Sequence, residues 1–93
     1  MEVVNGFKVV SPNQKVEGLV VEFHDTRPLF KLNRYYTDEH GEYQSEEKGR
    51  FDLFPRNRSS EELWRAFEEK LEELGHDASD VYLDESVMLF MKD

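Results

Sequence analysis

The stretch from Leu29 to Gly75 contains the clearest pattern of apolar and polar positions in the chain. Phe30, Leu32 and Tyr36 alternate with polar residues, which is the period of a strand with one buried face. Asp38-Glu39-His40-Gly41 follows and supplies turn-forming residues. A second alternating run and a helical pattern come next. The pattern predicts a strand, a tight turn, a second strand and a helix.

Two further alternating runs precede this block. Short loops separate consecutive runs, and short loops join antiparallel strands. The strands that we expect are Val3–Val10, Val16–His24, Leu29–Thr37 and part of Glu42–Phe54.

A helix is predicted from its start signal, its apolar spacing and its stop signal. Ser59 and Glu62 have the spacing of a capping box, in which each side chain bonds to the other residue's backbone N–H. Gly75 is a typical residue to end a helix. Between them, one stripe of apolar residues at helical spacing faces the sheet: Trp64, Phe67, Leu71 and Leu74.

Two apolar runs follow the helix, separated by Asp84-Glu85-Ser86. We expect Val81–Leu83 to be a short extended piece. Val87–Met91 is apolar on both faces, which is typical of a final strand that is covered on both sides. Such a strand at a free edge would promote aggregation. We therefore expect it to insert into the sheet of a monomer, and a symmetric homodimer is the alternative.

These elements predict an α+β fold with a mostly antiparallel four- to five-stranded sheet and one amphipathic helix packed on one face. A chain of 93 residues is expected to form a single compact domain over residues 1–93. The predicted core consists of Phe7, Val9, Leu19, Val21, Phe30, Leu32, Phe51, Leu53, Trp64, Phe67, Leu71, Leu74, Leu89 and Phe90.

The composition indicates a protein of a reducing compartment. The chain contains no cysteine, which excludes disulfides and thiolate metal sites. The first residues have neither the basic nor the apolar region of a signal peptide. The longest apolar run, Val87–Met91, is too short to span a bilayer. We expect a cytoplasmic protein.

The net charge of −9 is concentrated in the last third of the chain. Residues 59–93 contain three basic and eleven acidic residues, a net charge of −8. Residues 27–58 contain seven basic and six acidic residues, a net charge of +1. A negative field repels nucleic acid and attracts basic partners.

Catalytic and metal-binding motifs are missing from the sequence. Three histidines have an aspartate nearby, but none has the second histidine or the helical spacing of a local metal site. Ser59 and Ser60 lack a nucleophile elbow, and the capping of the helix explains them. We therefore expect no enzyme, no cofactor and no metal. The histidine pairs are His24-Asp25, His40 near Asp38, and His76-Asp77.

The acidic helix suggests a function in protein binding. Glu68–Glu72 and Glu69–Glu73 are like-charge pairs four residues apart, which destabilise a helix. A solvated polar face explains the acidic residues but does not require repulsive pairs. Our leading hypothesis is a non-catalytic module that binds a protein with a basic surface. In size and acidity it resembles phage inhibitors or regulators of host nucleic-acid enzymes. The predicted partner-binding residues are Glu61, Glu68, Glu69, Glu72, Glu73, Asp77, Asp80, Asp84 and Glu85.

The sheet region suggests the alternative, a single-stranded nucleic-acid-binding protein. Aromatic side chains stack on bases and cations pair with phosphates, and both occur together here. Six carboxylates share the segment, so an ordinary mixed surface also explains it. The candidate residues are Lys31, Arg34, Tyr35, Tyr36, Tyr43, Lys48 and Arg50.

The segments 32–38, Gly41-Glu42 and 48–53 resemble the whirly-type transcriptional coactivators, also called the positive cofactor family. The shared pattern is an aromatic-ended strand, an Asp-x-x-Gly-Glu turn, a Lys-Gly pair and a following helix. The resemblance implies a curved antiparallel sheet, dimerisation and single-stranded DNA binding. The chain departs from the family pattern at Glu46-Glu47, where the family has cations, and by its additional segment Val81–Met91.

Overall fold

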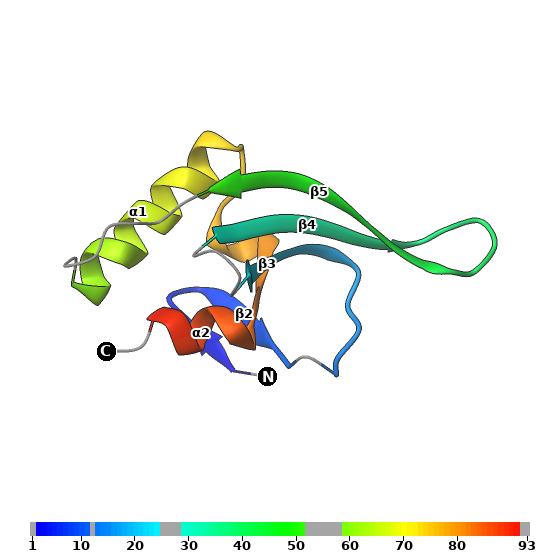
Figure 1. The fold of residues 1–93 in the computed structure, drawn as a ribbon, viewed down its shortest axis with the longest axis horizontal. Coiled ribbons are helices and arrows are strands. Elements are labelled where there is room, and N and C mark those ends of the chain that lie inside the picture. Colours follow the sequence, from blue (N-terminus) through cyan, green and yellow to red (C-terminus); the bar gives the residue numbers. More distant parts are fainter. Residues whose placement is uncertain (1, 12, 25–28, 52–58, 92–93) are drawn as a thin grey trace.

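The computed structural model describes residues 2–11, 13–24, 29–51 and 59–91 of the chain (Figure 1). A 3₁₀ helix, Ala78–Asp80, follows the longer of two α-helices. The strands are β1 (Val3–Val4), β2 (Phe7–Val10), β3 (Gly18–His24), β4 (Leu29–Thr37), β5 (Tyr43–Phe51) and β6 (Val81–Asp84), and the helices are α1 (Ser60–Glu73) and α2 (Glu85–Met91).

The strands form one mixed sheet in the order β1-β2-β6-β3-β4-β5. Strand β6 lies between β2 and β3 and is parallel to both, with Tyr82 opposite Lys8 on one side and Val20 on the other. The remaining pairs are antiparallel. The α+β prediction is confirmed, but the sheet formed by the described residues has six strands and parallel pairing at its centre. Loop length predicts only the pairing of consecutive strands, and β6 pairs with strands far away in sequence.

The predicted strand Val3–Val10 is divided by a tight turn at Asn5 and Gly6. Their φ angles are +50° and +87°, the left-handed conformation that Asn and Gly tolerate. Val4 pairs with Phe7, so two residues connect β1 and β2. Asn-Gly is the preferred sequence for such a hairpin, because its backbone twist matches that of the strands. The second predicted strand also begins later than expected, at Gly18.

Helix α1 begins and ends at the signals in the sequence. The Ser59 side chain accepts a hydrogen bond of 3.3 Å from the backbone N–H of Glu62. At the other end, Gly75 has a φ of +89° and its N–H donates to the Glu72 carbonyl. The N–H of His76 donates to the Leu71 carbonyl at 2.9 Å. These two bonds form a Schellman motif, which satisfies carbonyls that the last helical turn leaves open.

The prediction of a final strand over Val87–Met91 is wrong, because this segment is helical in α2. Asp84 accepts a 2.9 Å hydrogen bond from the backbone N–H of Ser86 and satisfies one open donor of the first turn. The Ser86 hydroxyl also accepts from the N–H of Phe23 in β3. The central place predicted for this segment is occupied by β6, and the helix still buries Val87 completely.

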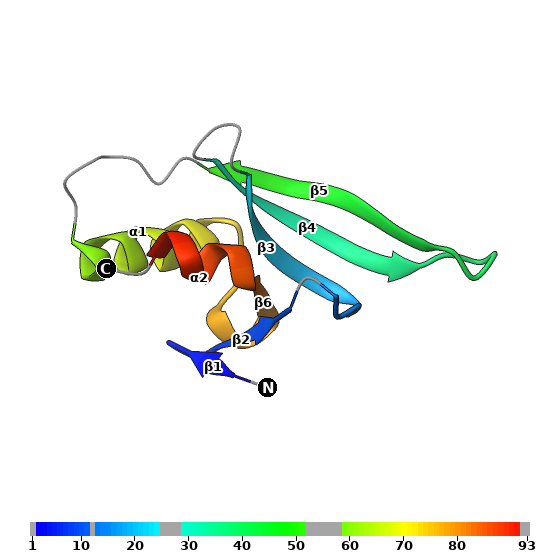
Figure 2. The ribbon, with the colours of Figure 1, turned by 60° about the horizontal axis from the view of Figure 1, so that its bottom comes forward.

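Both helices lie on one face of the sheet, which we call the helix face (Figure 2). Phe67 of α1 is fully buried, and its ring centroid lies 5.4 Å from that of Phe7 and 5.9 Å from that of Phe30. Helix α1 is therefore held on the sheet by aromatic contacts. The predicted core residues found buried are Phe7, Val9, Val21, Phe30, Leu32, Phe67 and Leu71.

The other predicted core residues have different positions. Leu19 and Trp64 are partly buried against the core. Leu74 is 36% exposed, because it lies at the C-terminal cap of α1, where its side chain approaches Gly49 of β5. The side chains of Phe51, Leu53, Leu89 and Phe90 lie outside the described residues. The buried residues that were not predicted are Val10, Val20, Val81, Leu83 and Val87.

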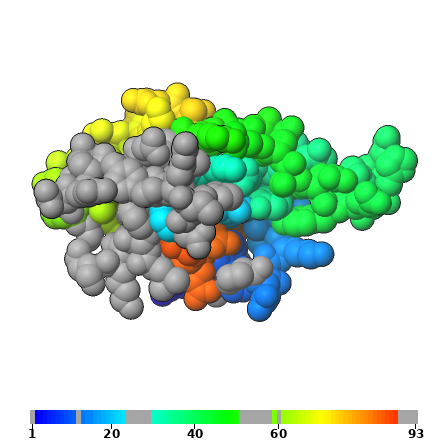
Figure 3. Space-filling view, viewed as in Figure 1, coloured from blue at the N-terminus to red at the C-terminus, as the bar shows by residue number. Residues whose placement is uncertain are grey.

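Strands β4 and β5 continue beyond the rest of the sheet as a projecting hairpin (Figures 1 and 3). The Asp38 carboxylate fixes its turn by accepting 2.9 Å hydrogen bonds from the backbone N–H groups of His40 and Glu42. Lys48 has no cross-strand partner, because Glu47 pairs with Asn33 and Gly49 with Leu32. This bulge interrupts β5 at the edge of the sheet, which hinders pairing with another strand. Neither helix in the described part of the chain has the length and apolar content needed to cross a bilayer.

Candidate functional site

A groove runs along one side of α1, between this helix and the β1–β2 turn. Its wider part has a volume of about 520 Å³ and lies over Phe7, Leu71 and Ala78. A neighbouring hollow of about 390 Å³ lies beside Trp64. Both hollows are lined by Asn5 and Glu68, so they form one continuous depression. We call it the α1 groove, and its charged lining residues are Glu61, Arg65, Glu68, Glu72, Asp77 and Asp80.

The local fold explains why carboxylates gather here. Residues three or four positions apart share one side of a helix, so Glu61, Glu68 and Glu72 line the same flank of α1. The Schellman turn then reverses the chain and places Asp77 and Asp80 beside them. The groove therefore collects acidic residues from the helix and from the 3₁₀ helix that follows it.

Most of these carboxylates have no counterion nearby. Glu61 lies 3.6 Å from Arg65, an exposed ion pair. No Lys or Arg of the described residues lies within 4 Å of the other four acidic groups of the groove. Hydrogen bonds from the Ser79 hydroxyl and backbone N–H lower the pKa of the Asp77 carboxyl. The groove is therefore negative at neutral pH.

The structure divides the predicted partner-binding residues. Glu61, Glu68, Glu72, Asp77 and Asp80 line the α1 groove. Glu69 and Glu73 are exposed on α1 outside the groove, and Glu73 lies 3.3 Å from Lys70. Asp84 lies at the end of β6, beside the face of the sheet that lies opposite the two helices. Glu85 is exposed at the start of α2. The prediction did not include Asn5 or Trp64, although the Asn-Gly pair signals the turn that forms one wall.

The candidate nucleic-acid residues are divided between the two faces of the sheet. In β4, Arg34 and Tyr36 lie two and four residues after the buried Leu32, so they point to the same face as Leu32, which is the helix face. Lys31 and Tyr35 point to the opposite face, which we call the open face and which includes Val10, Val20 and Glu22. The β5 register assigns Tyr43 and Arg50 to the open face, while Lys48 at the bulge lines a hollow with Arg34.

The four cations of this set all pair with two neighbouring glutamates of β5. Glu46 lies 3.2 Å from Arg34 and 2.8 Å from Lys48. Glu47 lies 3.6 Å from Lys31 and 2.8 Å from Arg50. These pairs lower the pKa of both carboxyls, mainly through hydrogen bonds from Lys48 and Arg50. Each of the four candidate cations therefore already has a carboxylate partner within the protein, which agrees with the mixed surface that the sequence also allowed.

The three tyrosines of the set are engaged within the protein. The rings of Tyr35 and Tyr43 are stacked, with centroids 5.3 Å apart. The Tyr35 hydroxyl donates to the Glu22 carboxylate, and the Tyr43 hydroxyl donates to the Val16 carbonyl. Burial and the bond to Glu22 raise the pKa of Tyr35. The guanidinium of Arg34 lies 4.8 Å from the centre of the Tyr36 ring.

The histidines are found in separate places. His40 is exposed at the hairpin turn, 3.7 Å from Glu39. His76 lines the α1 groove, and the side chain of His24 lies outside the described residues. Among the described residues, no three His, Asp or Glu side chains are close enough together to hold a metal ion.

The comparisons with known proteins yield no relative. No family model matches the chain, and neither does any curated protein or solved structure. The resemblance to the whirly-type coactivators therefore stays a prediction from the sequence.

Proposed function

We propose that this protein is a non-catalytic binding module that holds a basic segment of another protein in the α1 groove. One observation supports this proposal above all. Glu68, Glu72, Asp77 and Asp80 converge on one hollow, and no Lys or Arg in the described part of the chain lies within 4 Å of them. Glu46 and Glu47 of β5, by contrast, are both paired with cations.

Basic side chains would relieve the repulsion between these carboxylates. Glu68 and Glu72 are four residues apart on α1, a spacing at which like charges destabilise a helix by about 0.2–0.5 kcal/mol. A partner's Lys or Arg side chains convert this repulsion into attraction. Such attraction accelerates encounter and weakens as salt is added.

Trp64 provides an apolar contact at the other end of the groove. It is partly buried, and its ring centroid lies 5.8 Å from that of Phe67, so the core holds the indole in place. Its remaining surface faces the groove beside Glu61. Tryptophan is enriched among the residues that dominate binding energy, and its face attracts guanidinium groups. We therefore favour an arginine-containing segment as the ligand.

The class of partner that we propose is a host nucleic-acid enzyme, inhibited or regulated through its basic surface. Enzymes that bind nucleic acid present such surfaces to phosphates. A row of carboxylates along a helix offers them a competing negative surface. The small, acidic, cysteine-free chain supports this narrower proposal by composition.

The alternative, single-stranded nucleic-acid binding, receives less support from the geometry. Its cations are paired with Glu46 and Glu47, and its tyrosines are divided between the two faces of the sheet. Titration of a fluorescent oligonucleotide at low salt separates the two functions. Binding that weakens with added salt and with Tyr36→Ala would favour the alternative.

The test uses two double variants that remove the same charge from the same helix. Glu68→Gln with Glu72→Gln changes the groove, and Glu69→Gln with Glu73→Gln changes α1 outside it. Both pairs are spaced four residues apart. The full chain is immobilised and used to capture proteins from lysate at low and high salt.

We expect a salt-sensitive partner that the groove variant binds about five- to thirtyfold more weakly, since two exposed charge contacts contribute about 1–2 kcal/mol together. The control variant should bind like the unmodified chain. Equal losses in the two variants would show that overall charge, not the groove, attracts the partner. Capture that is insensitive to salt would also contradict the proposal.

A further inference from the structure

The open face of the sheet contains a second cavity of about 300 Å³, separate from the α1 groove. Its floor includes Val10 and Val20, which are only 2% and 3% exposed although both helices lie on the other face. The chain between β2 and β3 covers them and lines the cavity with Ser11, Gln14, Lys15 and Val16. We call this space the tyrosine cavity, after the two rings of its wall.

The wall is formed by the stacked rings of Tyr35 and Tyr43, whose planes are 19° apart. Both hydroxyls are held, one by Glu22 and one by the Val16 carbonyl. The carboxylate of Glu17 also accepts a 2.9 Å hydrogen bond from the backbone N–H of Thr37. These bonds fasten the covering segment to β4 and β5, so the aromatic wall is already in place before any ligand binds.

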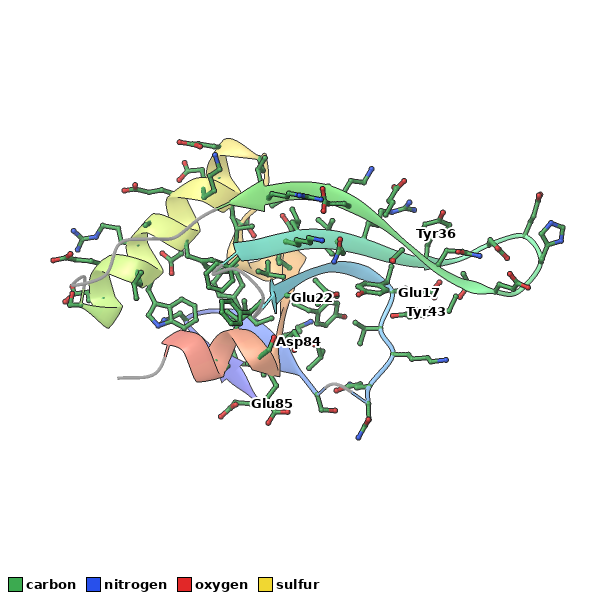
Figure 4. All side chains as sticks on the ribbon, in the orientation of Figure 1. Glu17, Glu22, Tyr36, Tyr43, Asp84 and Glu85 are labelled. Atoms are coloured by element: carbon green, nitrogen blue, oxygen red, sulfur yellow. The ribbon has the colours of Figure 1, made fainter. Side chains whose placement is uncertain are left out.

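Two carboxylates from neighbouring strands complete the lining. Glu22 belongs to β3 and Asp84 to β6, and Figure 4 labels both of them together with Tyr43. Each has one oxygen engaged, Glu22 by the Tyr35 hydroxyl and Asp84 by the backbone N–H of Ser86. No Lys or Arg among the residues that the structure describes lies within 4 Å of either carboxylate.

We propose that the tyrosine cavity binds an organic cation, namely an alkylammonium or guanidinium group. Aromatic faces attract such cations, carboxylates accept their N–H hydrogen bonds, and an apolar floor suits the carbon chain that carries the charge. The lining combines all three features on preformed strands. An inorganic anion or a neutral apolar molecule would leave both carboxylates without a counterion.

One lysine that lines the cavity and one that lies opposite Glu22 support this assignment. Lys31 lies opposite Glu22 in the β3–β4 pairing, but its ammonium is 3.6 Å from Glu47. Lys15 lies at the cavity, with its ammonium 5.4 Å from the centre of the Tyr43 ring. The protein's own cation thus already uses the aromatic wall. Lys15 would compete with a ligand for this ring.

The cation has two possible sources, a free amine or a Lys or Arg side chain of a peptide. The probes that distinguish them are butylamine and the blocked amino acids N-acetyl-lysine methylamide and N-acetyl-arginine methylamide. N-acetyl-norleucine methylamide has a similar shape without the charge and serves as the neutral control. Binding is measured by NMR, from the ring resonances of Tyr35 and Tyr43 during titration of the full chain.

We expect the charged probes, but not the norleucine amide, to shift these resonances in a saturable way. Glu22→Gln and Asp84→Asn retain the carbonyl oxygen that accepts the existing hydrogen bonds, and each should weaken binding about fivefold. Lys15→Met should strengthen it about two- to threefold, because the competing cation is lost. Binding of butylamine would identify a free amine as sufficient, whereas binding of the blocked amides alone would identify a side chain.

Equal shifts with the norleucine amide would overturn the proposal, as would unchanged affinity in both carboxylate variants. Circular dichroism of each variant establishes that it is folded. Glu68→Gln, on the opposite side of the molecule in the α1 groove, should leave amine binding unchanged. The outcome is therefore independent of the proposed function of that groove.

Discussion

Phe67 connects helix α1 to the sheet, and replacing it by alanine tests how the fold is held together. The side chain is fully buried, and its ring contacts those of Phe7, Phe30 and Trp64 with centroid distances of 5.4, 5.9 and 5.8 Å. Truncation of a buried Phe to Ala lowers the free energy of unfolding by about 3–5 kcal/mol. A domain of 93 residues has about 5–14 kcal/mol in total. The variant should therefore be close to unfolding.

Urea denaturation followed by circular dichroism and by Trp64 fluorescence measures this loss. A loss of about 4 kcal/mol moves the midpoint down by about 1.3–4 M for a typical slope of about 1–3 kcal/mol per M. Phe67→Leu keeps part of the buried volume and should lose about 1–2 kcal/mol. Trp64→Ala should lose less than Phe67→Ala, because Trp64 is only partly buried.

Leu74→Ala is the matched control, since Leu74 belongs to the same apolar stripe of the sequence but is 36% exposed. We expect it to lose less than about 1.5 kcal/mol. If Phe67→Ala destabilises the protein no more than Leu74→Ala does, then α1 does not pack through Phe67 and our account of the core is wrong.

Two further predictions concern turns. Gly6→Ala should destabilise the protein more than Gly41→Ala in urea denaturation. Both glycines have a positive φ, which makes alanine unfavourable by about 1 kcal/mol at either site. At Gly6 the new Cβ would also lie 3.3 Å from the Cβ of Ala78, whereas at Gly41 it would have no atom within 4 Å. The opposite order would contradict the close approach of the first turn to the 3₁₀ helix. Hydrogen bonds lower the pKa of Asp38; the largest effect comes from the Glu42 N–H and the second largest from the Gln44 side chain. The hairpin turn should therefore be fully ordered at pH values above the ordinary Asp pKa of about 3.9. Its order should be lost as the pH falls through the lowered pKa of Asp38. NMR titration of the His40 and Glu42 amides measures this midpoint, and a value at or above the ordinary one would refute the expectation.

The elements that the sequence predicted well depend on neighbouring residues. The bounds of β4, Leu29–Thr37, agree with the alternating pattern, because a strand with one buried face needs that alternation. The start of α1 agrees with the capping residue Ser59, because an open helix end needs a local acceptor. Both features are determined by physical requirements that act within a few residues.

The features that the sequence did not predict depend on distant parts of the chain. An apolar run such as Val87–Met91 suits a covered strand or a short buried helix equally well. The segment is helical because β6 occupies the centre of the sheet and because the Asp84 carboxylate accepts a hydrogen bond from the Ser86 N–H at the start of the helix. The α1 groove likewise depends on Asn5 and Asp77 lining the same hollow although they are far apart in the sequence, and no local pattern reveals that arrangement. Acidic composition predicted the charge of the site but not its shape.

The central position of β6 has a consequence for how the protein is made. Among the strands of the sheet, β2 is hydrogen-bonded to β1 and to β6, and β6 alone links this N-terminal hairpin to β3. The ribosome synthesises β3, β4, β5 and α1 between β2 and β6, so the first hairpin must wait for all of these elements before it can join the sheet. The antiparallel strands β3, β4 and β5 can pair while synthesis continues, since their partners are close in sequence. During that interval the edges of β2 and β3 that later pair with β6 are unpaired. Unpaired strand edges can pair with a second nascent chain, so this is the stage at which we expect aggregation or chaperone binding.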